Sequence, residues 1–398
     1  MQNANQQGNQ HINQQLSDTF NAMADGLLSG QCDRKTRIGL TLIGSELGEA
    51  ELLHGAQLVS RQYSDIELVL IGGEQAGEFE HHPASNLTEC HQVMELLFAD
   101  KQIDGCVTLH YAFPLGVSTM GKVVTPGTGR EMFIASTTGT SDTNRQAALL
   151  KNTIYGIALA KASGIEKPSV GVLNIDGAAQ CERGLKELQQ AGYDIHFADS
   201  SRADGGIAMR GNDLLRGTPD VMVTDSLTGN LLMKMFSSFT TGGSFEASGF
   251  GYGPGLSKDG CADGQLVSII SRASGAPVVA GAIRLCADAA KGEVMKRVNE
   301  EWEAASLAGI NNLVNKYKQP VAIDAKSDVK ADVVAPPEKV TDTDIGGIDI
   351  LEIEDACQVL WKMNIFARTG MGCTGPIILV AKEDKEAAKA KLVEAKYL

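Results

Sequence analysis

Cys373 lies within a short run of glycines, a combination of residues that can present a nucleophile. Gly370, Gly372 and Gly375 surround this cysteine, and the apolar run 377–380 follows. Glycines allow a sharp turn and leave the thiol uncrowded, while backbone N–H groups in such a turn favour the thiolate. The pattern predicts a nucleophilic cysteine in a glycine turn before a strand. The alternative is a buried cysteine that packs like a small apolar residue beside a tight turn.

Two further loops combine hydroxyl groups with the start of a predicted helix. The first spans 137–142 and includes Thr140 and Ser141, after a predicted strand at 132–136 and before a predicted helix at 144–163. Its hydroxyls and the helix N-terminus could hold an oxyanion. The alternative is that Ser141 or Asp142 only caps the helix.

The second loop spans 225–230, between a predicted strand and a helix that contains Lys234. Glycine at position 229 permits close backbone approach, and the helix dipole and the lysine favour an anion. The alternative is a capped turn with a solvated lysine. The candidate phosphate- or acyl-binding residues of this loop and helix are Asp225, Thr228, Gly229, Asn230 and Lys234.

Neither a dinucleotide site nor a zinc site is expected. The glycine-rich run 242–255 lacks the G-x-G-x-x-G spacing, and it is interpreted as a loop that contacts a ligand or as a surface loop. None of the eight cysteines forms a CxxC pair. We therefore expect no cofactor and no bound metal.

Composition restricts the class of protein. The chain has 398 residues, 43% hydrophobic content and a formal net charge of −14. The acidic balance argues against nucleic-acid binding and against anionic membrane surfaces. No apolar stretch approaches the ~18 residues of a membrane span, and neither a signal peptide nor a disulfide framework is indicated. We expect a cytoplasmic protein.

Apolar strands alternate with amphipathic helices over most of the chain, which predicts a three-layer α/β/α domain at 34–318 with a mostly parallel sheet. Residues 1–33 are expected to form a Gln/Asn-rich tail and a short amphipathic helix, and 319–340 a linker. Residues 341–398 are expected to form a small βαβα module that carries Cys373. Its strands are expected at 348–353 and 377–381 and its helices at 354–363 and 382–396.

Three segments resemble the phosphate acyltransferase family of phospholipid synthesis (PlsX). They are 164–175, 211–213 together with 216–217, and 220–230. The resemblance implies an isopropylmalate-dehydrogenase-like fold and the synthesis of acyl phosphates from an acyl thioester and inorganic phosphate. The chain departs from that family's pattern at 43–48 and 110–118, and the module with Cys373 lies beyond the family's usual end.

A second resemblance covers nearly the whole chain after the Gln-rich tail. Segments 37–44, 335–340, 351–361 and 370–376 resemble the alpha subunits of component C of glycine/sarcosine/betaine reductase complexes. In that family a carboxymethyl group on a small selenoprotein becomes an acetyl thioester on a cysteine of component C, and phosphate releases acetyl phosphate. Cys373 matches the thioester cysteine. The implied partners are the component C beta subunit, the carboxymethylated selenoprotein (component A), inorganic phosphate and acetyl phosphate, in a homo- or hetero-oligomer.

Three hypotheses follow. In the first, Cys373 accepts an acetyl group while loops 137–142 and 225–230 hold phosphate. In the second, the chain is a phosphate acyltransferase without a covalent intermediate, and Cys373 is structural. In the third, the chain is a non-catalytic subunit that docks a partner. The choice among glycine, sarcosine and betaine is expected to lie in another component.

Overall fold

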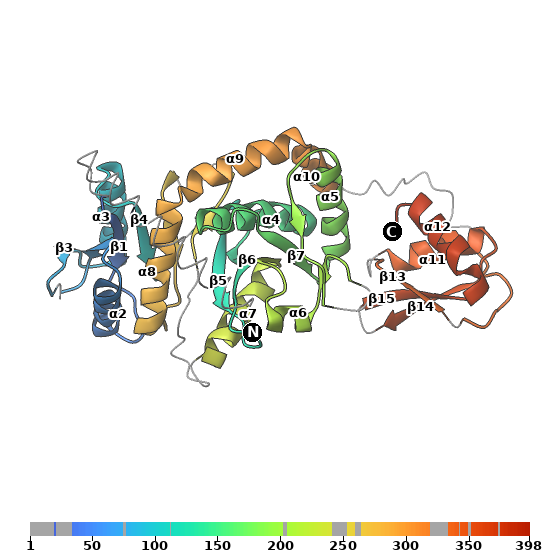
Figure 1. The fold of residues 1–398 in the computed structure, drawn as a ribbon, viewed down its shortest axis with the longest axis horizontal. Helices are drawn as coiled ribbons and strands as arrows, with labels where there is room; N and C mark the ends of the chain where they lie inside the picture. Colours follow the sequence, from blue (N-terminus) through green and yellow to red (C-terminus); the bar gives the residue numbers. More distant parts are fainter. Residues whose placement is uncertain are drawn as a thin grey trace.

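The computed structural model describes residue 20 and the ranges 34–74, 77–111, 113–201, 205–240, 253–258, 264–318, 333–341, 343–348, 352–372 and 375–398. Within these ranges the chain forms three sheets, which lie one after another along the long axis of the molecule (Figure 1). Most of residues 1–33 and 319–332 lie outside the described ranges, so the expected tail, helix and linker stay predictions.

The first sheet is parallel and follows the order β12-β4-β1-β2-β3. Its strands are β1 (Thr36–Thr41), β2 (Ile66–Ile71), β3 (Glu80–His82), β4 (Gly105–Thr108) and β12 (Val267–Ile269). Side chains alternate between its two faces: Leu68 and Leu70 join one hydrophobic cluster and Val69 and Ile71 join another. The helices that cover it are α2 (Glu49–Gln62), α3 (Leu87–Ala99) and α8 (Ala276–Lys291).

The second sheet follows the order β11-β5-β6-β10-β7-β8, and β9 also pairs with β7. Its strands are β5 (Ser118–Val124), β6 (Glu131–Gly139), β7 (Ser169–Leu173), β8 (His196–Phe197), β9 (Ala208–Met209), β10 (Val221–Val223) and β11 (Gly255–Leu256). The pairs from β6 through β8 are parallel, whereas β5 pairs antiparallel with both β6 and β11. The expected three-layer, mostly parallel architecture is confirmed, with two sheets instead of one.

Helices cover both faces of the second sheet. One side carries α4 (Arg145–Ala162), α5 (Ala178–Gln190), α9 (Val294–Leu307) and α10 (Ile310–Lys318), and the other carries α6 (Gly211–Arg216) and α7 (Ser226–Thr240). Helix α4 is buried on almost every side. Gly156 allows its close approach to the sheet, because a Cβ at this position would lie 2.6 Å from Val221 Cγ1.

Strand β5 was not expected from the sequence, and β6 is longer than the predicted strand at 132–136. The residues of β5, Ser118–Val124, include Ser, Thr, Gly and Lys, although most of them are buried. An apolar run, the signal used for buried strands, is therefore absent from this segment. The antiparallel β5–β6 pair extends the sheet beyond the parallel strands.

The C-terminal module forms an antiparallel sheet in the order β13-β15-β14 with its own hydrophobic core. Its elements are β13 (Thr343–Gly346), α11 (Ile353–Lys362), β14 (Ala367–Gly372), β15 (Gly375–Val380) and α12 (Lys385–Glu394). Strand β14 is an addition to the expected βαβα order. Of the strand expected at 348–353, residues 349–351 lie outside the described ranges; β13 precedes that range, and Ile353 already belongs to α11. Only Ile345 of β13 is buried, so the sequence of this strand does not show the alternation of apolar and polar residues that predicts a strand.

The module lies at one end of the molecule, beside α5 (Figure 1). Arg183 of α5 joins the two parts: its guanidinium lies 3.3 Å from the Glu352 carboxylate and donates to the Lys396 carbonyl, also at 3.3 Å. Of the helices in the described ranges, none has the length and apolar character needed to cross a membrane.

Candidate active site

A cleft of about 260 Å³ lies at the carboxyl ends of β6 and β10. These strands are parallel neighbours, so the loops that follow them meet at one edge of the sheet. The cleft is lined by Ser136, Gly139, Thr140, Asp142, Thr143, Arg145, Ala148, Leu149, Asn152, Asp225, Ser226 and Leu227. The fold thus brings together the two loops that the sequence singled out.

In the first loop, Thr140 borders the cleft and Ser141 does not. The Ser141 side chain is buried, and its hydroxyl donates to Asn152 Oδ1 at 2.7 Å. The expected alternative, a helix cap at Ser141 or Asp142, is wrong. Asn144 is the N-cap of α4, because its side chain accepts from the Ala147 N–H at 3.0 Å.

Asp142 is an anion whose charge is already balanced. Its carboxylate is almost fully buried, and the ammonium groups of Lys151 and Lys318 each lie 2.7 Å from Oδ2. Burial alone would raise the pKa of Asp142, but the hydrogen bonds from the two lysines hold the pKa below its usual value. Asp142 therefore joins the first loop to α4 and α10.

In the second loop, Asp225 caps α7. Its carboxylate accepts from the Thr228 N–H at 3.0 Å and from the Thr228 hydroxyl at 2.8 Å. This is the capped turn that the sequence left open as the alternative. Asp225 borders the cleft, whereas Thr228, Gly229, Asn230 and Lys234 are not among its lining residues.

Gly229 and Lys234 lie away from the cleft lining. A Cβ at Gly229 would lie 1.8 Å from the Ser136 carbonyl oxygen, so this glycine lets the first turn of α7 pack on the β6 backbone. Lys234 is exposed on α7. Gly229 therefore serves helix–strand packing in this structure.

Arg145 is the cation of the cleft, and the sequence interpretation missed it. It is the first residue of α4 and is 57% exposed, and its Nη1 lies 2.9 Å from Asp176 Oδ2. Helix N-termini and a guanidinium both attract anions. The available signal was its position, since a basic residue at the start of a helix after a β-strand points to the ligand edge of the sheet.

Asn152 was also missed, and it connects the strands around the cleft. Its Oδ1 accepts from the hydroxyls of Ser118 at 2.9 Å and Ser141 at 2.7 Å, and its Nδ2 donates to the Thr224 carbonyl at 3.3 Å. A single buried amide thus joins β5, the first loop and the end of β10. A lone Asn in an apolar helix was the only sequence signal.

The other sequence candidates lie partly or wholly outside the described ranges. Most of the glycine-rich run 242–255 is among them, and so is Cys373. The ladder of β14 and β15 pairs Gly370 with Ile377 and Gly372 with Gly375. Gly370 and Gly372, which were expected to form the turn, therefore belong to β14, and Gly375 belongs to β15.

Buried cysteines elsewhere are poor nucleophiles. Desolvation by burial raises the pKa of Cys90 and Cys357 to about 11 and that of Cys181 to about 12, and raises that of Cys106 well above its usual value. These thiols stay protonated at neutral pH, and the thiolate is the reactive form. Within the described part of the chain, no group of three or more His, Cys, Asp or Glu side chains is arranged to hold a metal ion.

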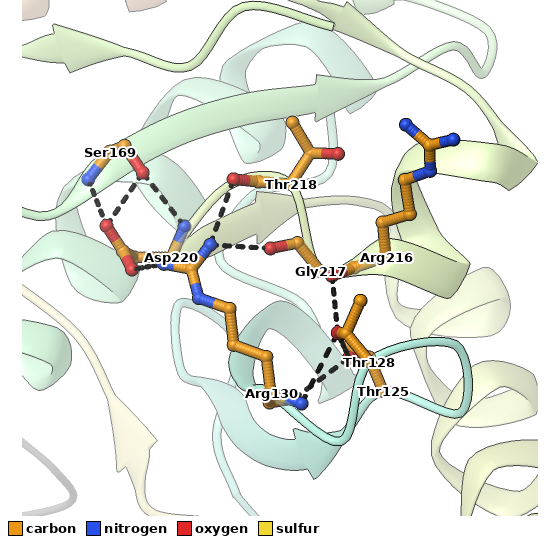
Figure 2. Close-up of polar contacts among 8 residues, drawn as sticks. All are labelled: Thr125, Thr128, Arg130, Ser169, Arg216, Gly217, Thr218 and Asp220. Carbon is orange, nitrogen blue, oxygen red and sulfur yellow. Dashed lines mark hydrogen bonds and ion pairs between the residues drawn. The ribbon is translucent and has the colours of Figure 1, made fainter. Parts of the chain in front are cut away.

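A polar network holds the opposite edge of the second sheet (Figure 2). Asp220, just before β10, accepts from the Ser169 N–H at 2.8 Å and hydroxyl at 2.7 Å, and it pairs with Arg130. Arg130 also donates to the Gly217 carbonyl at 2.7 Å, at the end of α6. The side chain of Arg216 points away from this network (Figure 2). These residues stabilise the fold at the edge remote from the cleft.

We expect Asp220→Ala to lower the free energy of unfolding by about 1–3 kcal/mol, because the half-buried donors of Ser169 and the exposed guanidinium of Arg130 lose a charged acceptor. Asp194→Ala is the matched control, since Asp194 is 77% exposed in its contact with His196, and it should change stability by less than ~0.5 kcal/mol. Urea unfolding of both variants measures the difference. Equal stability of the two variants would contradict the assignment.

Asp213, from the segment 211–213, also has a structural role. Its buried carboxylate accepts from the Ser200 hydroxyl and the Ser201 N–H, both at 2.8 Å, and from the Arg210 N–H at 2.9 Å. Burial alone would raise the pKa of Asp213, but the hydrogen bonds from Ser201 and Ser200 lower it below the usual 3.8. The carboxylate therefore ties the loop at 200–201 to α6.

The lowered pKa predicts a pH-dependent effect of Asp213→Asn. The stabilising contribution is complete above the unfolded-state pKa near 3.8 and disappears as pH falls through the lower folded-state value. We expect the variant to be less stable by about 1.5–3 kcal/mol at pH 7. The difference should shrink below about pH 4. Urea unfolding at several pH values tests this, and a difference that does not change with pH would contradict it.

Comparisons with known proteins place the chain in a family. A sequence model of the family described as "Fatty acid synthesis protein" matches residues 36–379. The glycine/sarcosine/betaine reductase complex component C subunit alpha of Peptoclostridium acidaminophilum is 47% identical over 384 residues, which cover 96% of this chain and 98% of that protein. A phosphate acyltransferase of Thermotoga neapolitana is 27% identical over 229 residues, 50% of this chain and 68% of that protein.

Among solved structures, a branched-chain phosphotransacylase from Enterococcus faecalis matches 64% of this chain and 99% of its own, with a TM-score of 0.48 and 14% identity. That overlap is too loose to support a statement about function. The match over 36–379 and the 47% identity over nearly the full length of both proteins are specific. The chain therefore belongs to the fatty acid synthesis protein family, and within it to the alpha subunits of component C of glycine/sarcosine/betaine reductase complexes.

Proposed function

We propose that this chain transfers an acetyl group from a thioester on Cys373 to inorganic phosphate and releases acetyl phosphate. In this step a phosphate oxygen attacks the thioester carbonyl, a C–O bond forms, the C–S bond breaks and the thiolate leaves with the electron pair. A carboxymethylated selenoprotein and a component C beta subunit would be its further partners. The observation that carries the proposal is the cleft at the ends of β6 and β10.

The cleft has the chemistry that an oxyanion needs. The Arg145 guanidinium supplies positive charge, Thr140, Thr143 and Ser226 supply hydroxyl groups, and the N-termini of α4 and α7 lie beside them. Helix N-termini and charge-assisted hydrogen bonds both stabilise phosphate oxygens. The two lysines balance the charge of Asp142, which therefore does not repel the ligand as an isolated carboxylate would.

Cysteine reactivity supports the choice of Cys373. Cys90, Cys106, Cys181 and Cys357 are all held as neutral thiols by burial. Cys373 follows Gly372 and precedes Thr374 and Gly375 in the sequence, between two paired strands. Backbone N–H groups of a glycine-rich turn would favour a thiolate there.

The step requires the module and the cleft to come together. The acetyl group would be attached in the C-terminal module, whereas phosphate would bind on the second sheet (Figure 1). The described contacts of Arg183 with Glu352 and Lys396 join these parts at exposed or half-buried positions, and such surface pairs are weak. The C-terminal module could therefore approach the cleft of its own chain or the cleft of a second chain.

A phosphate acyltransferase without a covalent intermediate is the second candidate. Phosphate acyltransferases align with about half of this chain, and the cleft is built from residues of the second sheet without any cysteine among its lining residues. In that reaction, phosphate would attack an acyl thioester brought by another molecule. Cys373 would then contribute nothing to the chemistry.

Isotope exchange tests the proposal. The purified chain is incubated with acetyl phosphate and labelled inorganic phosphate, with no thiol acceptor present. A covalent acetyl-enzyme predicts that label enters acetyl phosphate, because each half of the reaction can reverse without another substrate. Absence of exchange, both for the chain alone and for the chain with its complex partners, would contradict the proposal.

A further inference from the structure

Strand β14 lies at the edge of the C-terminal sheet, and the chain continues from it to Cys373. The sheet has the order β13-β15-β14, so among the described residues no strand pairs with the outer side of β14. Its antiparallel ladder with β15 runs without a register shift from the pair of Ala367 and Val380 to the pair of Gly372 and Gly375. An edge strand of this kind presents backbone N–H and C=O groups to which another extended chain can bind.

Two observations indicate which backbone groups of β14 point outward. Met371 lies opposite Pro376, which has no N–H, so these residues cannot form a pair that exchanges two hydrogen bonds. The Ala367 carbonyl accepts from the Trp361 indole N–H at 2.8 Å, as expected for a carbonyl that faces away from β15. Because the two kinds of pair alternate along an antiparallel ladder, the backbone groups of Ala367, Thr369 and Met371 all point outward.

The outward edge is already used at its start but not closer to Cys373. The Ala367 carbonyl is satisfied by Trp361 and by the Cys357 thiol. At Thr369 the described contact is that of the side chain, whose hydroxyl donates to Glu354 Oε1 at 3.2 Å. Natural edge strands are commonly blocked by lysine, proline or a bulge, and β14 has none of these. The edge is therefore open to strand pairing beyond its first residue.

One face of the module's sheet offers a place for a side chain of an added strand. Helices α11 and α12 lie on the other face, where Ile378 and Val380 are buried against them (Figure 1). On the face opposite the helices, a Cβ at Gly370 would lie 3.3 Å from Leu379 Cδ1 and 3.6 Å from Ile377 Cγ1. Ile377 and Leu379 are only half-buried. An apolar side chain placed opposite Gly370 can therefore cover them.

The position of this edge indicates what occupies it. Cys373 follows Met371 by two residues, which span at most about 7 Å of extended chain. A chain paired with Met371 therefore comes within reach of Cys373. A second copy of β14 is a poor candidate, because the formal net charge of −14 opposes association of two copies. Antiparallel pairing of two copies about Thr369 would also place the two Cys373 residues at opposite ends of the ladder.

We propose that β14 binds an extended segment of the protein partner that brings a group to Cys373, by addition of a strand to the C-terminal sheet. Backbone hydrogen bonds to Thr369 and Met371 hold the segment, and an apolar side chain over Gly370 selects it. The segment has no proline at the paired positions, because proline cannot donate. The partner is defined by the group that it brings to Cys373, so the inference rests on the proposed function.

Hydrogen exchange of the full chain, with and without the purified carboxymethylated selenoprotein, tests the docking. In the free chain, the backbone amides of Thr369 and Met371 should exchange fast, whereas those of the alternate residues of β14 are bonded to β15 and should exchange slowly. We expect saturating selenoprotein to slow exchange at Thr369 and Met371. Mass spectrometry with fragmentation that resolves single amides measures the change.

Thr369→Pro removes one outward N–H, a change that edge strands tolerate. We expect the affinity for the selenoprotein to fall by about 10-fold or more, because a carbonyl of the added strand loses its donor. Thr369→Val is the matched control, since it keeps the N–H and loses only the hydroxyl that contacts Glu354, and its affinity should be unchanged. Circular dichroism and thermal unfolding establish that the variants are folded.

A proline at the other edge of the sheet is a second control. Leu379 directs its backbone groups to β14, so Asp344, opposite Leu379 on the far side of β15, points its own N–H outward from β13. Asp344→Pro should therefore leave the affinity for the selenoprotein unchanged. Equal loss of affinity in Asp344→Pro and Thr369→Pro would show that proline acts through the stability of the module and would overturn the assignment to β14.

Unchanged exchange at Thr369 and Met371 in the presence of saturating selenoprotein would overturn the proposal, and so would a selenoprotein that does not bind. Protection that increases with the concentration of the chain alone would assign the edge to a second copy, also against the proposal. Labelled phosphate separates this docking from the proposed function. A chain that exchanges phosphate without protection of β14 refutes only the docking, whereas protection of β14 without phosphate exchange refutes only the phosphate chemistry.

Discussion

Replacing Cys373 by alanine is expected to abolish exchange of labelled phosphate into acetyl phosphate, with a loss of at least about 1,000-fold. The physical reason is that the acetyl group has no thiolate to occupy once phosphate leaves, so the half-reaction cannot occur. A serine variant should also be inactive at neutral pH, because an alkoxide is far less accessible than a thiolate. The rate of exchange at saturating acetyl phosphate measures the effect.

Cys357→Ala is the control for this experiment. Cys357 belongs to the same module, but it is buried and its thiol donates to the Ala367 carbonyl at 3.3 Å. Burial raises the pKa of this thiol to about 11, so it cannot serve as the nucleophile at neutral pH. We expect reduced stability and retained exchange. Full exchange by Cys373→Ala would instead favour the non-covalent phosphate acyltransferase.

The second large effect is expected at Arg145. Arg145→Gln should raise the KM for phosphate by about 10–100-fold, since charge-assisted hydrogen bonds to an anion contribute about 1.5–3 kcal/mol and the site is partly open to solvent. The fold should tolerate the change, because Arg145 is 57% exposed and its partner Asp176 is 67% exposed. Initial rates over a range of phosphate concentrations measure the effect.

Lys234→Gln provides the matched removal of one positive charge. Lys234 is exposed on α7 and is not among the residues that line the cleft. We expect a change in KM of less than about two-fold, since an exposed charge at a distance is screened by salt. An effect of Lys234→Gln equal to or larger than that of Arg145→Gln would show that phosphate does not bind in this cleft.

The contrast between Arg145, which lines the cleft, and Lys234, which does not, shows what the sequence could predict. Periodicity located α4 and α7 and the strands before them, and parallel strands imply that their following loops share one edge. Which side chains face the cleft depends on how each helix is rotated about its axis and on close contacts between segments. The spacing of apolar residues in the sequence determines neither. Gly229 is an example: it looked like a ligand-binding glycine, but its neighbour is the Ser136 carbonyl.

Long-range polar contacts explain most of what the sequence could not predict. Ser141 was a candidate for binding, yet its hydroxyl donates to Asn152, eleven residues further along. The segments 211–213 and 220–230 are motifs of the resemblance, but Asp213 and Asp220 hold loops and strand starts together. Hydroxyl and carboxyl groups have the same appearance in a sequence whether they bind a substrate or the chain's own backbone.

The central claim is that Cys373 carries an acetyl group, and peptide mass spectrometry tests it most directly. The purified chain is incubated with acetyl phosphate, quenched in acid and digested. We expect an acetyl group on the Cys373 peptide that hydroxylamine removes, because hydroxylamine cleaves a thioester. Consumption of acetyl phosphate without any acetyl group on that peptide would contradict the account.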